Sequence, residues 1–202
     1  MAPARIYVEV DILCGVEDVW MLTHDPEMLP RWDARFSSIT PTGRLASGAH
    51  RFTYERSTPF HTFVGTVTAL REPTELDGTR ASALRFTTRD TFSALGAGHG
   101  YWRCIPFGSG VRLITAFDYE PGWGSALDAL VVRRLIGWMT AWSFDRLRIW
   151  AETGVPPENW PWWSVLQVWR RDRPRASRCR RAPQYARGGI REPSTLAMLE
   201  TP

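Results

Sequence analysis

Lysine is absent from this sequence, and all 25 basic residues are arginines. Chemistry that needs an ammonium side chain, such as a Schiff base or the phosphate-binding lysine of a P-loop, is therefore excluded. Cysteine is sparse as well: there are three, and they show no CxxC or other metal-ligand spacing. A small, odd number of cysteines without such spacing indicates a reducing compartment and no disulfide framework.

Long apolar runs are also missing. No uncharged apolar run reaches the length of a membrane span, and residues 1–13 lack the basic and apolar regions of a signal peptide. Residues 170–202 hold nine arginines against three acidic residues, whereas the rest of the chain holds 16 arginines against 18 acidic residues. The body thus lacks the basic face that binds nucleic acid. We expect a cytoplasmic protein that does not bind nucleic acid.

Motifs of metal- and cofactor-dependent enzymes do not occur. The four histidines form no pair at metal-ligand spacing and no HExxH, and there is no GxSxG nucleophile motif. Residues 96–100, GAGHG, lack the strand-to-helix context of a dinucleotide motif. We therefore expect no metal and no cofactor. A lone histidine as general base stays open beside the reading of these histidines as surface residues.

The residues that are present alternate in a way typical of strands. Residues 5–13, RIYVEVDIL, place apolar and polar side chains on opposite faces, which predicts a half-buried strand. Two short helices follow, the second after Asp25-Pro26 and ended by Pro30. From Phe36 to Glu120 the chain is rich in threonine, valine and aromatic residues between turn signals. This pattern predicts six or seven antiparallel strands in a meander.

One long helix is predicted over residues 124–153, ended by Gly154. At helical spacing, one stripe is formed by Leu127, Val131, Leu135, Trp138, Trp142 and Ile149. Only this helix is long enough to cover the apolar face of the sheet, so the sheet must curve around it. We expect one domain over residues 1–157, a Trp-rich short helix or cover over 158–170, and a disordered Arg- and Pro-rich tail over 171–202.

Three stretches carry a resemblance to a known family: residues 16–36 (VEDVWMLTHDPEMLPRWDARF), residues 100–124 (GYWRCIPFGSGVRLITAFDYEPGWG) and residues 137–158 (GWMTAWSFDRLRIWAETGVPPE). In this order they resemble the SRPBCC superfamily, the START-like helix-grip fold of polyketide cyclases/dehydrases and lipid-transfer proteins. The resemblance covers roughly residues 4–158. It implies an α+β fold, with a curved antiparallel sheet around a C-terminal helix, and a ligand-sized cavity. It implies no reaction, because the fold hosts enzymes, carriers and sensors.

Aromatic residues on the long helix have two readings. Trp138 and Trp142, one turn apart, either form a wall of the cavity or pack in the core. Asp145 and Arg146 interrupt the apolar helix. Arg146 either binds a ligand oxygen at the cavity mouth, or one of the two charges forms a structural ion pair with Asp33 or Arg35.

Side chains on the predicted strands complete the expected site. Tyr101 and Arg103 share one face of their strand, so both point inward or both point outward. An inward arginine or tyrosine would stabilise an oxyanion. The expected ligand-binding residues are Trp138, Trp142, Phe117, Tyr101, Arg103, Arg146, Phe63 and Tyr119.

The expected function is binding of a hydrophobic or aromatic small molecule between sheet and helix. If the protein is an enzyme, it is a cyclase or dehydrase that acts by positioning and oxyanion stabilisation, without metal or covalent nucleophile. The alternative is a non-catalytic carrier of lipid or another hydrophobic ligand that docks at membranes through Trp160, Trp162, Trp163 and the Arg-rich tail. In the other reading of this segment, it folds back and covers the arc of the long helix that bears Met139, Leu147 and Trp150.

Overall fold

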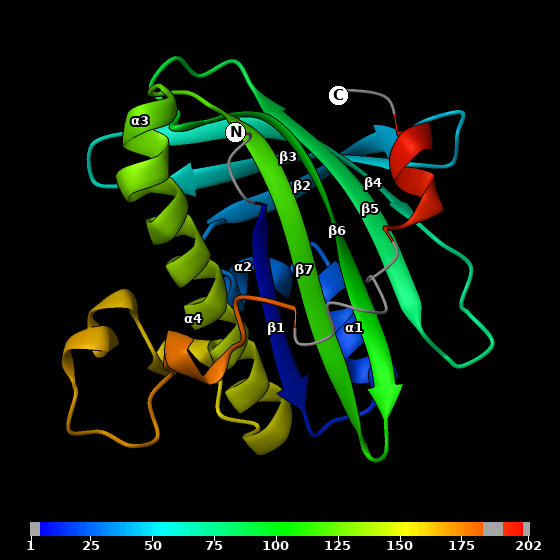
Figure 1. Cartoon of the computed structure of the whole chain (residues 1–202), viewed down its shortest axis with the longest axis vertical. Helices are drawn as coiled ribbons and strands as arrows, with labels where there is room; N and C mark the ends of the chain where they lie inside the picture. The colour runs from blue at the N-terminus through cyan, green and yellow to red at the C-terminus, as the bar shows by residue number, and fades with distance from the viewer. Residues whose placement is uncertain (1–4, 184–191, 200–202) are drawn as a thin grey trace.

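The computed structural model describes residues 5–183 and 192–199. Seven strands form one antiparallel sheet in the order β1-β7-β6-β5-β4-β3-β2 (Figure 1). Their bounds are β1 (Ile6–Ile12), β2 (Ser38–Arg44), β3 (His50–Ser57), β4 (Thr62–Arg71), β5 (Arg80–Thr88), β6 (Leu95–Phe107) and β7 (Gly110–Pro121). Strands β2 to β7 follow one another as a meander, and the first strand pairs with the last. The predicted meander is confirmed.

The first short helix lies where the sequence predicts it, whereas two others differ. The second was predicted to end at Pro30, but it carries Pro30 in its first turn, and the long helix starts irregularly. Strand β1 is followed by α1 (Val16–His24) and α2 (Leu29–Trp32). The long helix begins as α3 (Ser125–Leu127), continues through one π-helical stretch η1 (Asp128–Val132), and only then becomes α4 (Arg133–Thr153). It ends at Gly154, whose φ of 73° is left-handed, as a glycine cap requires.

The π-helical stretch coincides with a buried charged residue, Asp128. Asp128 is buried, accepts a hydrogen bond from the Tyr119 hydroxyl at 2.5 Å and pairs with the Arg133 Nε at 2.9 Å. Arg133 also pairs with Asp118 of β7 at 2.8 Å. The wider turn keeps the Asp128 carboxylate in contact with β7, and a hydrophobic stripe alone gives no sign of it.

The core lies between the concave side of the sheet and one face of α4. The ring of Phe144 lies 5.5 Å from that of Trp102 on β6 and 5.9 Å from that of Trp32 at the end of α2. Leu147 is fully buried on the same side of the helix. Val8 and Val10 of β1 belong to the same core cluster as Phe144 and Leu147 of α4. Their alternation with Tyr7, Glu9 and Asp11 on the other side of the strand is as predicted.

The segment after α4 folds back against the side of the helix that faces away from the sheet (Figure 1). It contains the 3-10 turns η2 (Pro157–Asn159), η3 (Trp162–Leu166) and η4 (Ala176–Arg178). Where a Trp-rich short helix or cover was predicted over residues 158–170, the chain forms the turn η3 after η2 and no longer helix. Trp160 is buried, whereas Trp162 and Trp163 are exposed.

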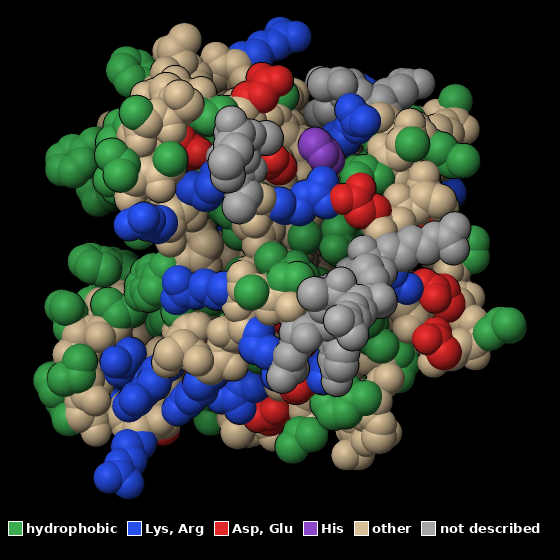
Figure 2. All heavy atoms as spheres, in the orientation of Figure 1, with side chains coloured by type: hydrophobic (Ala, Val, Ile, Leu, Met, Phe, Trp, Pro, Cys, Tyr) green, Lys and Arg blue, Asp and Glu red, His purple; other side chains and the backbone are tan. Residues whose placement is uncertain are grey.

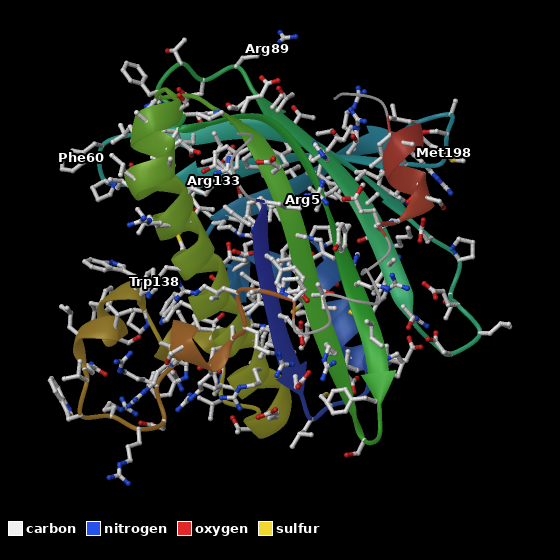
Figure 3. All side chains as sticks on the ribbon, viewed as in Figure 1. Arg5, Phe60, Arg89, Arg133, Trp138 and Met198 are labelled. Carbon is white, nitrogen blue, oxygen red and sulfur yellow. The ribbon has the colours of Figure 1, made fainter. Side chains whose placement is uncertain are left out.

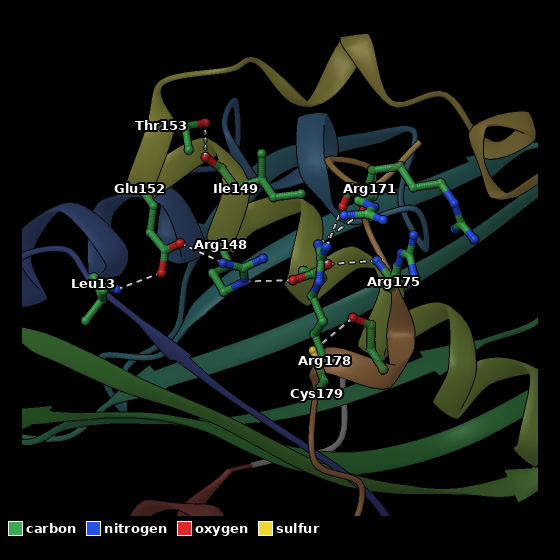
Figure 4. Close-up of polar contacts among 12 residues, drawn as sticks. Leu13, Arg148, Ile149, Glu152, Thr153, Arg171, Arg175, Arg178 and Cys179 are labelled. Atoms are coloured by element: carbon green, nitrogen blue, oxygen red, sulfur yellow. Dashed lines mark hydrogen bonds and ion pairs between the residues drawn. The ribbon is translucent and has the colours of Figure 1, made fainter. Parts of the chain in front are cut away.

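The expectation of disorder from residue 171 onward is wrong for residues 171–183. The buried carboxylate of Asp145 accepts from the Arg175 backbone N–H at 2.7 Å and from the Arg178 side chain at 3.0 Å (Figure 4). Arg180 pairs with Glu9 at 2.6 Å and forms two backbone hydrogen bonds with it at the free edge of β1. These arginines belong to the stretch expected to be disordered, but they neutralise carboxylates of the folded body.

The remaining part of the predicted tail includes a further turn, η5 (Ser194–Met198), on the outer face of the sheet. Its Leu196 packs with Leu199, Ala49 and Ala83. Residues 184–191 and 200–202 lie outside the described residues. No helix in the described part of the chain is long and apolar enough to cross a membrane.

Candidate functional site

The sheet extends well beyond the helix that it holds. Helix α4 packs mainly on β1, and it does not lie close against β3, β4 or β5. Strand register places six aromatic residues on the concave side, the side on which Trp102 contacts α4. We call this set the inner aromatic face: Phe52, Tyr54, Phe63, Phe86, Phe117 and Tyr119. The first four are half-buried, so their rings are neither packed away nor fully in water.

Glycines allow two of these rings to lie across neighbouring strands. A Cβ atom at Gly65 would lie 2.3 Å from the Cζ atom of Tyr54, and one at Gly98 would lie 2.3 Å from the Cζ atom of Phe86. Any side chain at these positions would displace the rings. The two glycines therefore allow a flat aromatic surface, which favours a ring-containing ligand.

One positive charge lies among these rings. The guanidinium carbon of Arg35 lies 5.2 Å from the ring centre of Phe117, 5.6 Å from that of Phe36 and 5.9 Å from that of Trp102. Arg35 donates through Nε and Nη2 to the fully buried carboxylate of Asp33, at 2.9 and 2.6 Å. The pair is neutral overall, and the Nη1 group has no hydrogen-bond partner among the described residues.

A second donor is the hydroxyl of Tyr54. Desolvation by burial raises the pKa of Tyr54 to about 12, so the phenol is neutral at physiological pH. Its hydroxyl has no hydrogen-bond partner in the described part of the chain. Phe36 lies between the two donors, since its ring meets that of Tyr54 at 5.7 Å and the Arg35 guanidinium at 5.6 Å. Both groups donate, so together they suit a carbonyl, carboxylate or phenolate oxygen.

The expected tryptophan wall lies elsewhere. Phe144 faces the sheet, and Trp142, two residues earlier, lies about 200° around the helix. Trp142 is 2% exposed, stacks on Trp138 at 6.4 Å, and lies on the side covered by the chain after the helix. Figure 3 shows Trp138 projecting from α4 away from the sheet. Only the later part of the predicted stripe is buried, at Trp142 and Ile149, whereas Leu127, Val131 and Leu135 are exposed. The long helix has two apolar sides, and residue spacing alone does not tell which side meets the sheet.

Arg146 cross-links backbone segments. It donates to the carbonyls of Arg31 at 3.0 Å, Trp32 at 3.1 Å and Pro157 at 2.8 Å, with its guanidinium 4.9 Å from the Trp142 ring. Desolvation lowers its pKa to about 10. Neither expected role, a ligand contact or an ion pair with Asp33, describes these contacts. Arg146 instead joins α4 to the end of α2 and to the returning chain.

Two more of the expected ligand-binding residues lie on the outer face of the sheet. Tyr101 and Arg103 both point outward, and Arg103 pairs with Glu75 at 2.6 Å. A polar pocket lies on this outer side, lined by Glu72, Glu75, Arg103, Glu192 and Ser194. Its charged lining does not suit a hydrophobic ligand, so we do not place the site there.

Three expected residues do lie on the inner aromatic face: Phe63, Phe117 and Tyr119. The hydroxyl of Tyr119 donates to Asp128, and burial, followed by this hydrogen bond, raises the pKa of Tyr119. The eight expected ligand-binding residues do not include Tyr54, and Arg35 was expected only as a possible ion-pair partner. Tyr54 shares its face with Phe52, but the pairing with Gly65 that fixes this face is a matter of register, and sequence does not give register.

Comparison with known proteins places this geometry in a family. Residues 3–152 match the family described as polyketide cyclase / dehydrase and lipid transport. The chain is 31% identical over 173 residues to "Uncharacterized membrane protein YndG" of Bacillus subtilis (strain 168), which covers 83% of this chain. It spans 65% of the length of that relative.

Two solved structures share the fold at low identity. The Zhui aromatase/cyclase from Streptomyces sp. R1128 has a TM-score of 0.53 and 12% identity, over 76% of this chain and 98% of that one. A START superfamily protein from Mycobacterium smegmatis has a TM-score of 0.51 and 12% identity, over 70% of this chain and 94% of that one. The predicted helix-grip fold is confirmed.

Proposed function

The chain belongs to the polyketide cyclase/dehydrase and lipid transport family, whose members bind hydrophobic small molecules, and we propose that it binds a ring-containing hydrophobic molecule on the inner aromatic face. One observation carries this proposal. The hydroxyl of Tyr54 and the Nη1 group of Arg35 are hydrogen-bond donors without an acceptor among the described residues, and they lie among half-buried aromatic rings.

The chemistry of the face selects the ligand class. Flat rings give large contact areas at low entropic cost, and they favour apolar or aromatic ligands. A ligand oxygen that accepts from Tyr54 and Arg35 would fix the orientation of the ligand, since the rest of the face offers little polar contact. The preferred ligand therefore has an apolar ring system and an acceptor oxygen at one end.

The same donors support a reaction. Ring closure or dehydration next to a carbonyl develops negative charge on an oxygen, and donors held in place stabilise that charge. A cyclase- or dehydrase-like enzyme would use Tyr54 and Arg35 in this way and would otherwise act by positioning. The relation to an aromatase/cyclase supports this reading only through the shared fold.

A second candidate function is a non-catalytic carrier. The exposed tryptophans after α4 favour it, and so does the relative that is named a membrane protein. In a carrier the two donors only bind the ligand, so a bound molecule is released unchanged. Native mass spectrometry of ligand recovered after incubation separates the two candidates.

Binding itself is tested with anilinonaphthalene sulfonate, an aromatic probe with an acceptor group. We expect Tyr54→Phe to weaken its affinity roughly two- to tenfold, the effect of one lost hydrogen bond. The matched control is Tyr101→Phe, because Tyr101 lies on the outer face of the same sheet. Equal affinity in the wild type and in Tyr54→Phe, or equal loss in both variants, would contradict this site.

A further inference from the structure

The chain after α4 presents a loop that lies outside the residues matched by the family model. We call residues 160–172 the tryptophan loop; they lie beyond the family match at residues 3–152. The flanking chain is held at both ends, since Pro157 accepts from Arg146 at 2.8 Å and the Arg175 backbone donates to Asp145 at 2.7 Å. Trp160, only 3% exposed, anchors the loop, with the Arg170 guanidinium 4.6 Å from its ring. The loop is thus fixed in place.

The outward side of this fixed loop is apolar. Five large side chains within eight residues are each between 52% and 75% exposed: Trp162, Trp163, Leu166, Val168 and Trp169. Figure 2 shows hydrophobic side chains beside arginines at the lower left, where Figure 1 draws this loop. A cluster of this kind on a fixed loop indicates an interaction surface.

Positive charge surrounds these side chains. Residues 170–181 hold seven arginines and one acidic residue, Asp172. Arg170 pairs with Asp172, and Arg178 and Arg180 pair with carboxylates of the body. The other four have no carboxylate partner among the described residues: Arg171, Arg173, Arg175 and Arg181.

We propose that the tryptophan loop docks the protein on an anionic lipid surface. Tryptophan prefers the headgroup level of a bilayer, and arginine is attracted by anionic lipid, so the two residue types act together there. A second copy of this chain fits less well, because a symmetric contact through this loop would bring the unpaired arginines of both copies together. Membrane docking would serve the carrier function proposed above, and to that extent this proposal rests on it. The contacts of the tryptophan loop with lipid do not depend on the inner aromatic face.

Sedimentation of the full chain with lipid vesicles tests the proposal. We expect binding to vesicles of phosphatidylcholine with phosphatidylglycerol, weaker binding to phosphatidylcholine alone, and a decrease at high salt. Arg171→Gln should weaken binding roughly fivefold, and Trp163→Ser should weaken it severalfold. The controls are Arg89→Gln and Trp123→Ser at the opposite end of α4; Trp123 has the same exposure as Trp163, 52%.

Three results would overturn the proposal. They are no binding to anionic vesicles, equal binding to both vesicle types, and loss in Trp123→Ser but not in Trp163→Ser. Self-association that Trp163→Ser abolishes, without vesicle binding, would assign the loop to a second copy. Tyr54→Phe should leave vesicle binding unchanged and Trp163→Ser should leave the Tyr54-dependent probe binding unchanged, so either site can fail without the other.

Discussion

Replacing Trp142 by alanine separates two roles for the tryptophan pair on α4. Trp142 is 2% exposed, stacks on Trp138 and lies under the Arg146 guanidinium, on the side of α4 that the returning chain covers. Deleting a buried tryptophan side chain costs about 3–5 kcal/mol. For a chain of this length that corresponds to a decrease of roughly 10 °C in the melting temperature. Because Trp142 does not lie on the inner aromatic face, probe affinity should not change.

The assay is thermal unfolding of Trp142→Ala followed by circular dichroism, with probe titration well below the transition. Trp163→Ala is the control, since an exposed tryptophan contributes less than about 0.5 kcal/mol. A melting temperature of Trp142→Ala equal to that of the control, together with a tenfold loss of probe affinity, would refute the reasoning and return Trp142 to the ligand site.

Two further predictions concern charge. Burial, and then the charge of Arg71, lower the pKa of His24 to about 3, whereas in the unfolded chain it is about 6.5. Below pH 6.5 His24 binds a proton in the unfolded chain but not in the folded chain. The free energy of unfolding therefore falls as the pH falls toward 3. If the ring were fully desolvated, this effect would lower the free energy of unfolding by about 2 kcal/mol at pH 5. Because the ring keeps some exposure, we expect about half of that. Between pH 7 and pH 5, His24→Gln should therefore lose about 1 kcal/mol less stability than the wild type, as measured by urea unfolding. Arg180→Gln should cost about 1–2 kcal/mol by the same method. Glu9 is 3% exposed, and among the described residues it would keep only Arg112 as a cationic partner, at 3.2 Å.

Each of these predictions has a control in the chain. His50 is exposed, so His50→Gln should keep the acid sensitivity of the wild type. Arg170→Gln breaks an exposed, solvent-screened ion pair with Asp172 and should cost clearly less stability than Arg180→Gln does. Identical pH profiles for wild type and His24→Gln, or equal losses in Arg180→Gln and Arg170→Gln, would contradict the accounts of these residues.

Local patterns in the sequence were enough to predict most of the fold. The alternation in β1, the turn signals between strands and the glycine cap at Gly154 are short-range features, and the structure confirms them. The π-helical stretch at Asp128 was not predictable in this way, because it depends on contacts with Tyr119 and Arg133 that only the folded chain brings together.

The candidate site was predicted less well, since it depends on which side of each element meets the core. The spacing of Trp142 is that of a buried stripe, and it is buried, but under the chain that follows the helix. The sequence does not tell whether Tyr54 or Tyr101 points to the concave side of the sheet, because only strand register separates the inner from the outer face. The prediction of a disordered tail failed for a related reason. Arg178 and Arg180 pair with carboxylates that lie far away in the sequence, and such pairs cannot be inferred from local composition.

The central claim is that an apolar ligand binds on the inner aromatic face. The most direct test locates the probe by intermolecular NMR contacts between anilinonaphthalene sulfonate and assigned aromatic protons. We predict contacts to Tyr54, Phe86 and Phe117. Contacts confined to exposed Trp163 and Trp169, with none to the inner aromatic face, would contradict the claim.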